Sequence, residues 1–354
     1  MAQEKEITTN FLKSCMNMIK NIYLFKTYKN PMKTLKPLFL ALALALSTTA
    51  ITTQAAEPTI TPQKQVAGFY HHQLGNVQIT ALLDGTNYLS PTLFKGIPAT
   101  EVTQILKKYH ADQAKGVQTS VNAFLVNTGS SLVLVDSGAS SCNGPDFGSV
   151  QKNLMTAGYK PEQVDTILLT HLHPDHVCGI SAKGVASFPN ATVYVANAEA
   201  NYWLDPKQAA KLPQDKQARF KQTVEKIQQA VQPYQAKKHF KTFKLGDNVK
   251  GFEVISTPGH TPGHFSFAFK SGNEEIVFVG DIVHSHSIQF DHPETAIDFD
   301  VDPKKAVQTR LAQFSRLAKN GQTVAAPHLP FPGIGHIYSK DGKSYQWIPV
   351  HFKD

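Results

Sequence analysis

A short run of histidine and aspartate residues is the strongest chemical feature of the sequence. The run THLHPDH at residues 170–176 follows directly after an apolar, strand-like stretch. Because side chains alternate along a strand, we expect His171 and His173 to lie on one side and bind a single metal ion. The proline after them turns the chain, which lets Asp175 and His176 face a second ion. Three imidazoles and a carboxylate are ligands suited to zinc or a similar divalent cation.

Three further polar residues each follow a predicted strand. His260 lies in the stretch TPGHTPGH, whose prolines and glycines predict a tight loop that holds the ring in place. Asp281 ends one strand, where its carboxylate could bridge two ions, and His328 ends another. Each of them, taken singly, would more often be a surface or core residue. Their shared position at strand ends, where functional residues gather on a rigid scaffold, makes them candidate ligands.

The elements that must position these residues are short strands and helices in alternation. We expect strands at 77–83, 121–126, 132–135, 166–170, 192–195, 252–256, 265–269 and 276–279. We expect helices at 100–109, 150–157, 215–231 and 303–318. Asp302 is a good N-cap for the last helix, with Pro303 at its first position. This order predicts one α/β domain.

The N-terminal segment has the composition of a secretory signal peptide. Two lysines precede an apolar run at 38–46, and small polar residues then lead to Ala55. We assign the signal peptide to residues 32–55, beginning at Met32, and residues 1–31 to an N-terminal extension. The apolar run is shorter than the roughly 20 residues that span a bilayer, so no stable membrane anchor is expected. The mature protein is expected in the periplasm or outside the cell.

Charge and composition restrict the partners of the mature chain. The 354 residues carry a formal charge of +8. Seven lysines and two acidic residues lie in the first 55 residues, which leaves 28 basic against 25 acidic residues, or +3. The net charge of the mature chain is therefore too small to favour the binding of nucleic acid. We expect a linker at 56–66 and a single α/β domain at 67–354.

The motifs HLHPDH, TPGHTPGH, VGD and a late histidine, in this order, resemble the metallo-β-lactamase superfamily of binuclear metallohydrolases. The resemblance covers nearly the whole mature chain and implies a four-layer αβ/βα sandwich with two divalent ions, expected to be zinc, at one edge of its two sheets. It assigns one ion to His171, His173 and His260, and the other to Asp175, His176 and His328, with Asp281 bridging. It also implies supporting roles for Asp84, His264 and His336, and Asp136 resembles the early loop motif of the family.

Several stretches resemble the secreted methyl parathion hydrolases, among them VNTGSSLVLVDSGA and HLPFPGIGHI. This resemblance implies a hydrolase whose metal-bridging hydroxide attacks phosphotriesters or related aryl esters, and a homodimer. The alternative is a lactonase or carboxylesterase of the same superfamily, acting on small molecules such as acyl-homoserine lactones. Class B β-lactamases are a poorer match, because their second metal is commonly held by a cysteine where this chain has Asp281.

The catalytic candidates are Asp281, Asp175 and His284. His284 lies where the lactonases place a tyrosine that assists the leaving oxygen, so it is either a proton donor or an exposed histidine. The candidate pocket residues, aligned with positions that flank the leaving group in the phosphotriesterases, are Trp203, Phe220, Phe299 and Asn143. The three aromatic residues could equally be core, and Asn143 would make one pocket wall more polar.

Two cysteines, Cys142 and Cys178, remain in the mature chain. The expected compartment permits a disulfide between them. The alternative is a small buried thiol at Cys178. We expect the thiol, because nothing in the sequence fixes the separation of the two residues.

Overall fold

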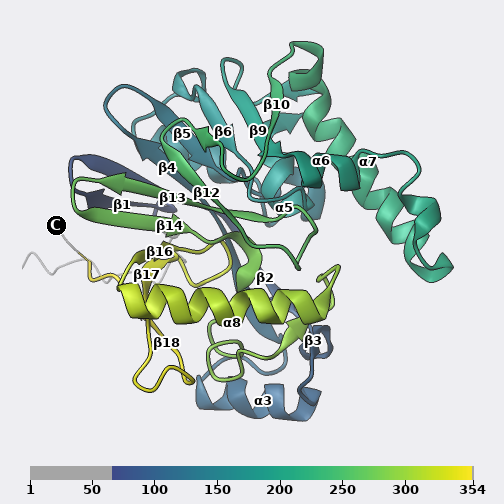
Figure 1. Cartoon of the computed structure of the whole chain (residues 1–354), viewed down its shortest axis with the longest axis vertical. Coiled ribbons are helices and arrows are strands. Elements are labelled where there is room, and N and C mark those ends of the chain that lie inside the picture. The colour runs from purple at the N-terminus through teal and green to yellow at the C-terminus, as the bar shows by residue number, and fades with distance from the viewer. Residues whose placement is uncertain (1–65, 353–354) are drawn as a thin grey trace, which may run out of the picture. The chain divides into compact units, whose positions relative to one another are not determined.

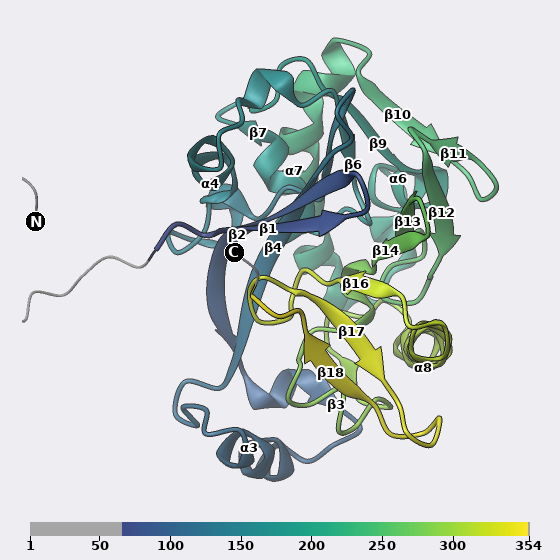
Figure 2. The same ribbon diagram turned by 90° about the vertical axis from the view of Figure 1, so that its left-hand side faces the viewer.

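The computed structural model describes residues 66–352. The expected extension, the signal peptide and the linker up to residue 65 lie outside the described residues. Within the described part of the chain, no helix is both long and apolar enough to cross a membrane. Two seven-stranded sheets form the centre of this part, and helices cover their outer faces (Figures 1 and 2).

The first sheet contains the N-terminal strands. Its order is β1 (Phe69–Leu74), β2 (Val77–Leu89), β4 (Val117–Asn127), β5 (Leu132–Val135), β6 (Thr166–Leu168), β9 (Thr192–Ala196) and β10 (Phe240–Phe243). The strands from β5 to β10 run parallel, whereas the others pair antiparallel. The segments that follow β5 and β6 therefore leave the sheet at the same edge.

The second sheet contains the C-terminal strands. Its order is β11 (Asn248–Val249), β12 (Phe252–Ser256), β13 (Phe265–Ser271), β14 (Glu274–Phe278), β16 (Thr323–Ala325), β17 (Ile334–Tyr338) and β18 (Gln346–Pro349). β13 pairs antiparallel with both β12 and β14, and β14 pairs parallel with β16. The loops that follow β12, β14 and β16 therefore meet at one edge.

Successive side chains of a strand point to opposite faces of its sheet, and here both faces are buried, so many strands are apolar throughout. In β5, Leu132 and Leu134 pack into the core beneath the helices of the first sheet, whereas Val133 and Val135 pack between the two sheets. In the second sheet, Ile276 faces the first sheet and Val277 faces the other side. Both sheets are thus buried on two faces, as a four-layer αβ/βα sandwich requires, and the expected fold class is confirmed.

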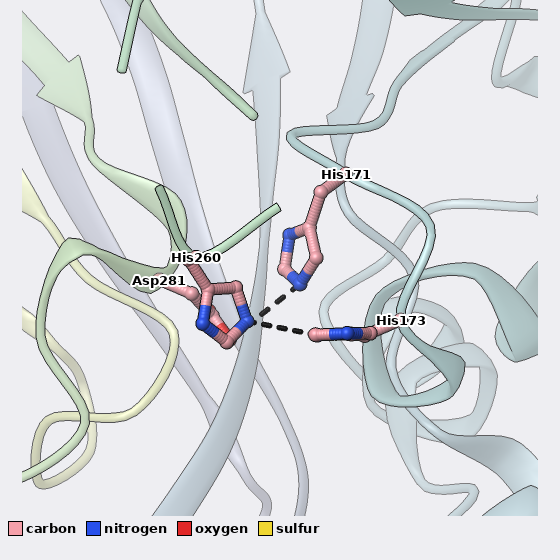
Figure 3. A group of neighbouring side chains, drawn as sticks. All are labelled: His171, His173, His260 and Asp281. Carbon is pink, nitrogen blue, oxygen red and sulfur yellow. Dashed lines mark hydrogen bonds and ion pairs between the residues drawn. The ribbon is translucent and has the colours of Figure 1, made fainter. Parts of the chain in front are cut away.

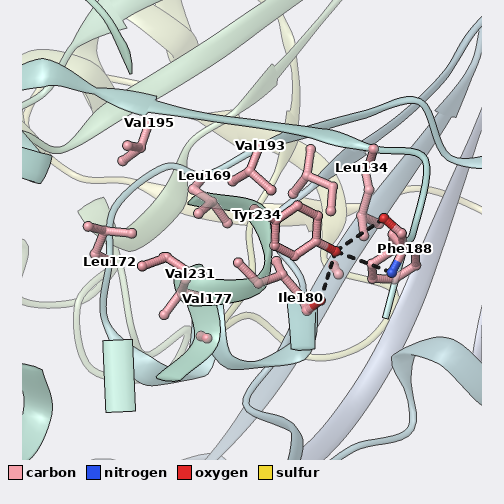
Figure 4. Packing of buried hydrophobic residues seen from close by; sticks show 14 of the residues in the cluster. Leu134, Leu169, Leu172, Val177, Ile180, Phe188, Val193, Val195, Val231 and Tyr234 are labelled. Atoms are coloured by element: carbon pink, nitrogen blue, oxygen red, sulfur yellow. Dashed lines mark hydrogen bonds between the residues drawn. The ribbon is translucent and has the colours of Figure 1, made fainter. Parts of the chain in front are cut away.

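Helices form the two outer layers. The helices over the first sheet are α4 (Val150–Thr156), α5 (Pro174–Val177), α6 (Asn197–Trp203) and α7 (Gln214–Ala236). In this layer the buried Tyr234 of α7 hydrogen-bonds to the backbone of Ile180 and Phe188 (Figure 4). Over the second sheet lies α8 (Pro303–Asn320), which Figure 2 shows nearly end-on.

Smaller elements complete the described chain. β3 (Phe94–Lys95) pairs with β15 (Ala296–Ile297), and β7 (Ser181–Ala182) pairs with β8 (Val185–Ala186). Next to the first of these pairs lies α3 (Ala99–Lys108), which packs with the end of β2 in a separate apolar cluster. The strand pair β3–β15 and α3 form an extension at one end of the sandwich, visible at the bottom of Figure 1.

Most of the predicted elements are present. The strands expected at 132–135 and 252–256 coincide with β5 and β12. The predicted cap is confirmed, since the Asp302 side chain accepts a hydrogen bond from the Lys305 amide at 3.0 Å. One detail was wrong: β6 ends at Leu168, two residues earlier than expected, so His171 and His173 lie in the following loop and not on a strand.

The structure corrects the expectation for the cysteines. Cys142 and Cys178 form a disulfide, so Cys178 is not a free thiol. Cys142 lies in the loop after β5 and Cys178 follows α5 in the loop after β6. Because β5 and β6 are parallel neighbours, these loops leave the same edge and the two Cα atoms come within 6.2 Å.

Candidate metal centre

The two sheets bring their candidate ligands together at one edge of the sandwich. The loop after β6 contributes His171, His173, Asp175 and His176, while α5 begins at Pro174 within that loop. The loops after β12, β14 and β16 of the second sheet contribute His260, Asp281 and His328. All seven predicted ligands thus belong to one cluster, although they lie between residues 171 and 328 in the sequence.

The carboxylate of Asp281 lies at the centre of this cluster. Its Oδ1 atom is 3.1 Å from Nε2 of His176 and 3.1 Å from Nε2 of His328. Its Oδ2 atom is 3.1 Å from Nε2 of His260 and 3.6 Å from Nε2 of His171. Nε2 of His328 also lies 3.2 Å from Oδ2. Oδ1 therefore faces the second predicted ligand group and Oδ2 faces the first, with His328 close to both oxygens, which is the arrangement that a bridging carboxylate needs.

The first ligand group contains His171, His173, His260 and Asp281, which point toward one another in Figure 3. Nδ1 of His173 lies 2.8 Å from Nε2 of His260. The second group contains Asp175, His176 and His328, with 3.5 Å between Nε2 of His328 and Oδ2 of Asp175. When the shared Asp281 is counted in both groups, each sheet supplies two ligands to each group.

The outer ring nitrogens of the candidate ligands are held by polar partners. Nδ1–H of His328 donates to the carbonyl of Ser120 at 2.9 Å. Nδ1 of His260 lies 2.8 Å from Oδ1 of Asp300, and Nδ1 of His176 lies 2.9 Å from Oδ2 of Asp136. Such contacts leave the Nε2 lone pairs directed at the centre, as metal-binding histidines require.

The expected supporting residues have different outcomes. Nε2 of the buried His264 accepts a hydrogen bond from the Asp281 amide at 2.9 Å, which helps to place the bridging carboxylate. Asp136 accepts hydrogen bonds from the amide and hydroxyl of Thr170 in addition to its contact with His176. Asp136 holds this place in the left-handed conformation, with φ of 56°.

The other two supporting residues do not touch the ligands. Asp84 accepts hydrogen bonds from the amides of Ala139, Gly148 and Val150, so it organises the loop after β5. The expectation for His336 was wrong. Its Nδ1 lies 3.2 Å from the carbonyl of Gln322, which precedes β16, whereas His328 follows the opposite end of that strand.

The pKa shifts of the cluster residues favour the binding of cations. Burial would raise the pKa of Asp281, but the surrounding imidazoles hold it well below its usual range. Burial and the neighbouring His176 lower the pKa of His171 well below its ordinary value. Burial also favours a neutral His260, but the carboxylates of Asp281 and Asp300 raise its pKa to about 9. The cluster therefore combines an ionised carboxylate with imidazoles that compete for positive charge.

The donor set fits divalent metal ions. Among the described residues, Nε2 of His171, Nε2 of His176 and Oδ1 of Asp281 are buried and lack a hydrogen-bond partner. Unsatisfied buried polar atoms are costly, and these three belong to the two ligand groups that meet at Asp281. Imidazole nitrogens and carboxylate oxygens in groups of three and four suit zinc and related ions. Two such ions would satisfy all three atoms.

The cluster opens to solvent on one side, where the candidate pocket residues lie. His173 and Asp175 are partly exposed, whereas the other five ligands are buried. The Trp203 ring contacts His173 at 5.3 Å between ring centroids and stacks on Phe220 at 5.0 Å. Trp203 and Phe220 are also part of the core, so the two alternatives for these residues are compatible.

Two further pocket candidates differ in their surroundings. The Phe299 ring lies 6.4 Å from that of His284 and is covered by the Arg219 guanidinium at 5.5 Å. Asn143 is exposed at the end of the short helical turn Ser140–Asn143, which carries the disulfide. Phe299 thus lies beside the cluster, whereas Asn143 lies on a loop that the disulfide of Cys142 connects to the loop after β6.

His284 is part of the cluster. It is 2% exposed, so the alternative of an exposed histidine is wrong. Its Nε2 lies 3.1 Å from Oδ2 of Asp281, and its ring lies parallel to that of His328 at 5.1 Å. In contrast to the outer nitrogens of His176, His260 and His328, its Nδ1 is buried and has no hydrogen-bond partner within residues 66–352.

Sequence reasoning missed three buried polar residues that support the cluster. Asp300 contacts the outer nitrogen of His260, and Gln289 accepts a hydrogen bond from the His284 amide at 2.7 Å. Glu199 accepts hydrogen bonds from both ligand loops. Their only signal in the sequence is a polar residue within an otherwise apolar or helical context, which is too common to be specific.

Comparisons with known proteins agree with this architecture. The model of the metallo-β-lactamase superfamily matches residues 116–328. The solved structure of the hydrolase AbOPH of the β-lactamase superfamily is 72% identical, with a TM-score of 0.81, and covers 82% of this chain and 100% of that chain. The comparison with curated proteins found no match.

Two more distant structures are also similar. The first is AidC, a dizinc quorum-quenching lactonase solved with the product N-hexanoyl-L-homoserine. It is 28% identical, with a TM-score of 0.73, over 81% of this chain and 99% of that chain. The second, a probable metal-dependent hydrolase from Staphylococcus aureus, is 19% identical with a TM-score of 0.64, over 80% of this chain and 100% of that chain, and shows the shared fold.

Proposed function

Because the chain belongs to the metallo-β-lactamase superfamily and is a hydrolase of that superfamily, we propose that it is a binuclear enzyme that hydrolyses phosphotriesters or related aryl esters. The observation that carries the proposal is the position of Asp281, with one carboxylate oxygen facing each of two ligand groups. The two divalent ions are proposed to be zinc, which the imidazole and carboxylate donors favour.

The position of each residue in the cluster determines which of the two proposed ions it would hold. His171, His173 and His260 would hold one ion, while Asp175, His176 and His328 would hold the other, and Asp281 would hold both. Two bound divalent ions would supply a water activated at neutral pH and would polarise the acceptor oxygen of the substrate. Asp136 and Asp300 keep two of the rings in place, so the donor atoms need no rearrangement.

An aryl leaving group is supported by the aromatic surroundings of the open side. Trp203 packs edge-on against His173, the ligand that is partly exposed, and Phe220 extends this aromatic surface. Phe299, between β15 and α8, lies beside His284. Aromatic rings of this kind favour a flat, apolar group next to the reacting centre. The resemblance of the sequence to methyl parathion hydrolases points to the same class of substrate.

A lactonase or carboxylesterase is the second candidate, and His284 is the observation that favours it. An alkoxide leaving group needs a proton donor, whereas a nitrophenolate leaves without one. His284 is next to Asp281, and its Nδ1 has no hydrogen-bond partner in the described part of the chain, so this nitrogen is free to take up a proton and pass it to a leaving oxygen. The similarity to the lactonase AidC agrees with this candidate.

Paired kinetics distinguish the two candidates. The purified mature protein, loaded with zinc, is assayed on an aryl phosphotriester, an aryl carboxylic ester and an N-acyl-homoserine lactone, with the Asp281→Ala variant as the blank. We expect the highest kcat/KM on the aryl phosphotriester. A lactone kcat/KM at least tenfold higher than both aryl values would instead establish the second candidate.

We also propose that the chain is exported and cleaved near Ala55. The disulfide between Cys142 and Cys178 supports export, because such bonds persist in oxidising compartments and are rare in the cytosol. Mass spectrometry of the exported protein should find an N-terminus at or near Ala56. A stable exported chain that keeps the apolar run at 38–46 would contradict the proposal.

A further inference from the structure

Glu199, in the first turn of α6, is a buried carboxylate next to the metal cluster. It is 0% exposed, and no ion pair with a cationic side chain is found for it among residues 66–352. It instead accepts four hydrogen bonds. Oε1 accepts from the Leu172 amide at 3.0 Å and from Nε1–H of Trp203 at 2.7 Å. Oε2 accepts from the Thr261 hydroxyl at 2.7 Å and from the Gly263 amide at 3.0 Å.

The donors come from three parts of the centre. Leu172 lies between the ligands His171 and His173, and Thr261 directly follows the ligand His260. Trp203 is the aromatic residue whose ring contacts His173. One carboxylate therefore ties the ligand loop of the first sheet, the ligand loop of the second sheet and the wall of the open side to one another.

The backbone around Glu199 is packed so closely that it needs glycine. A Cβ atom built on Gly263 would lie 2.1 Å from the Glu199 amide nitrogen. No other residue fits at 263 without moving the loop or the helix, because real Cβ atoms essentially never come within 3.0 Å of another heavy atom in this way. The motif TPGHTPGH and α6 are thus fitted to each other at this point.

We propose that Glu199 is the positioning residue that holds the His171–His173 loop and the His260 loop at the spacing required by the first metal ion. The inference rests on the proposed metal binding and extends it to a residue that contacts no metal. Loss of the carboxylate would leave the ligands present but incorrectly spaced. Residues that orient ligands in this way typically contribute 10–100-fold to metal affinity.

A glutamine at position 199 could keep the hydrogen bonds of only one of the two Glu199 oxygens in full. Leu172 N–H and Trp203 Nε1–H can only donate, so the carbonyl oxygen of a glutamine must face them. The amide nitrogen would then face Thr261 and Gly263. The Thr261 hydroxyl can rotate and accept, but the Gly263 amide would lose its acceptor. Glu199→Gln should therefore disturb the His260 loop more than the His171 loop.

The test is zinc binding, measured by elemental analysis and by competition with a chromophoric chelator. The wild type should bind two zinc ions per chain. In Glu199→Gln we expect the affinity for one of the two ions to fall about 10–100-fold while the other is retained. Trp203→Phe, which removes the Nε1–H donor but leaves the donors of both ligand loops to Glu199, should keep both ions.

Controls separate positioning from a loss of stability. Asp165→Asn removes a partly buried carboxylate that accepts from Ser131, Leu132 and Thr166 at the opposite end of β6. It should lower the melting temperature and keep both zinc affinities. If Glu199→Gln does not fold, Thr261→Val, which removes one donor to Oε2, should show the same selective loss to a smaller degree.

The outcomes are distinct. A wild type that binds no zinc contradicts the proposed function itself. If the wild type binds two ions and both zinc affinities of Glu199→Gln lie within twofold of the wild-type values, the role of Glu199 is overturned. If Glu199→Gln does not fold, the same result for Thr261→Val overturns it. Equal weakening of both ions in Glu199→Gln and Asp165→Asn also overturns it, because the effect would then follow stability and not loop position.

Discussion

Nε2 of His284 lies 3.1 Å from Oδ2 of Asp281, the carboxylate that both ligand groups share. Burial lowers the pKa of His284 to about 4, although Asp281 opposes the shift. The ring is therefore neutral near pH 7 and carries a single proton. Its proton lies on Nε2, which faces the Asp281 carboxylate, whereas Nδ1 has no hydrogen-bond partner among residues 66–352. To act as a proton donor, the ring must first take up a proton at Nδ1 and then pass it to the leaving oxygen.

We predict that His284→Ala separates the two classes of substrate. Without the ring, an alkoxide leaving group loses its proton donor, and the rate on a lactone should fall by roughly 10²-fold or more. An aryl phosphotriester with a nitrophenolate leaving group should keep nearly its full rate. The rates are compared with those of His286→Ala, because His286 packs against Tyr109 and lies outside the cluster. Equal small effects on both substrates would show that His284 takes no part in the reaction.

Replacing Asp281 should have the largest effect on metal content. One carboxylate faces both ligand groups, so Asp281→Ala should reduce the occupancy of both ions and abolish turnover. His171→Ala should empty mainly one site and His328→Ala mainly the other. Elemental analysis of the three purified variants checks this pattern. About two ions and intact activity in Asp281→Ala would remove this residue from the centre.

Removal of the ions should destabilise the folded protein. A ligand that binds only the native state stabilises it by about 4 kcal/mol when its concentration is 1,000 times Kd. The loss also leaves the buried Nε2 of His171 and Nε2 of His176 without partners. Chelation should therefore lower the melting temperature of the wild type, and added zinc should restore it. The same treatment should change Asp281→Ala far less.

The disulfide should contribute to both stability and metal binding. The bonded residues Cys142 and Cys178 are separated by 36 positions in the chain, and loops of this length are stabilised by about 2–4 kcal/mol. We expect the double variant Cys142→Ser/Cys178→Ser to lose this much free energy of unfolding, and therefore to unfold at a lower urea concentration. Because Cys178 lies two residues after His176, the affinity for the second ion should fall as well. An unchanged urea midpoint would show that packing alone holds these loops.

The sequence was most informative where the chemistry is local. The ligands of the first loop could be predicted because His171, His173, Asp175 and His176 lie within six positions of one another. The start of α8 could be predicted because its cap, Asp302, is adjacent to the helix. These signals depend on residues that are neighbours in the chain, so they can be recognised without knowledge of the fold.

The supporting residues could not be predicted, for the opposite reason. Glu199 meets Thr261 across 62 positions of the chain, and His260 meets Asp300 across 40. The partners of such a contact carry no common pattern, since the fold alone brings them together. The disulfide was misjudged in the same way, because the parallel pairing of β5 and β6 determines the distance between Cys142 and Cys178.

The equal division of ligands between the two sheets has a consequence for how the protein matures. Within the two predicted ligand groups, neither half of the chain offers an ion more than two protein ligands, whereas a stable zinc site usually has three or four. Binding of an ion by either complete group would therefore follow the docking of the N-terminal half on the C-terminal half. Once bound, each ion would link residues 171–176 to the loops that follow β12, β14 and β16, and would slow the separation of the halves.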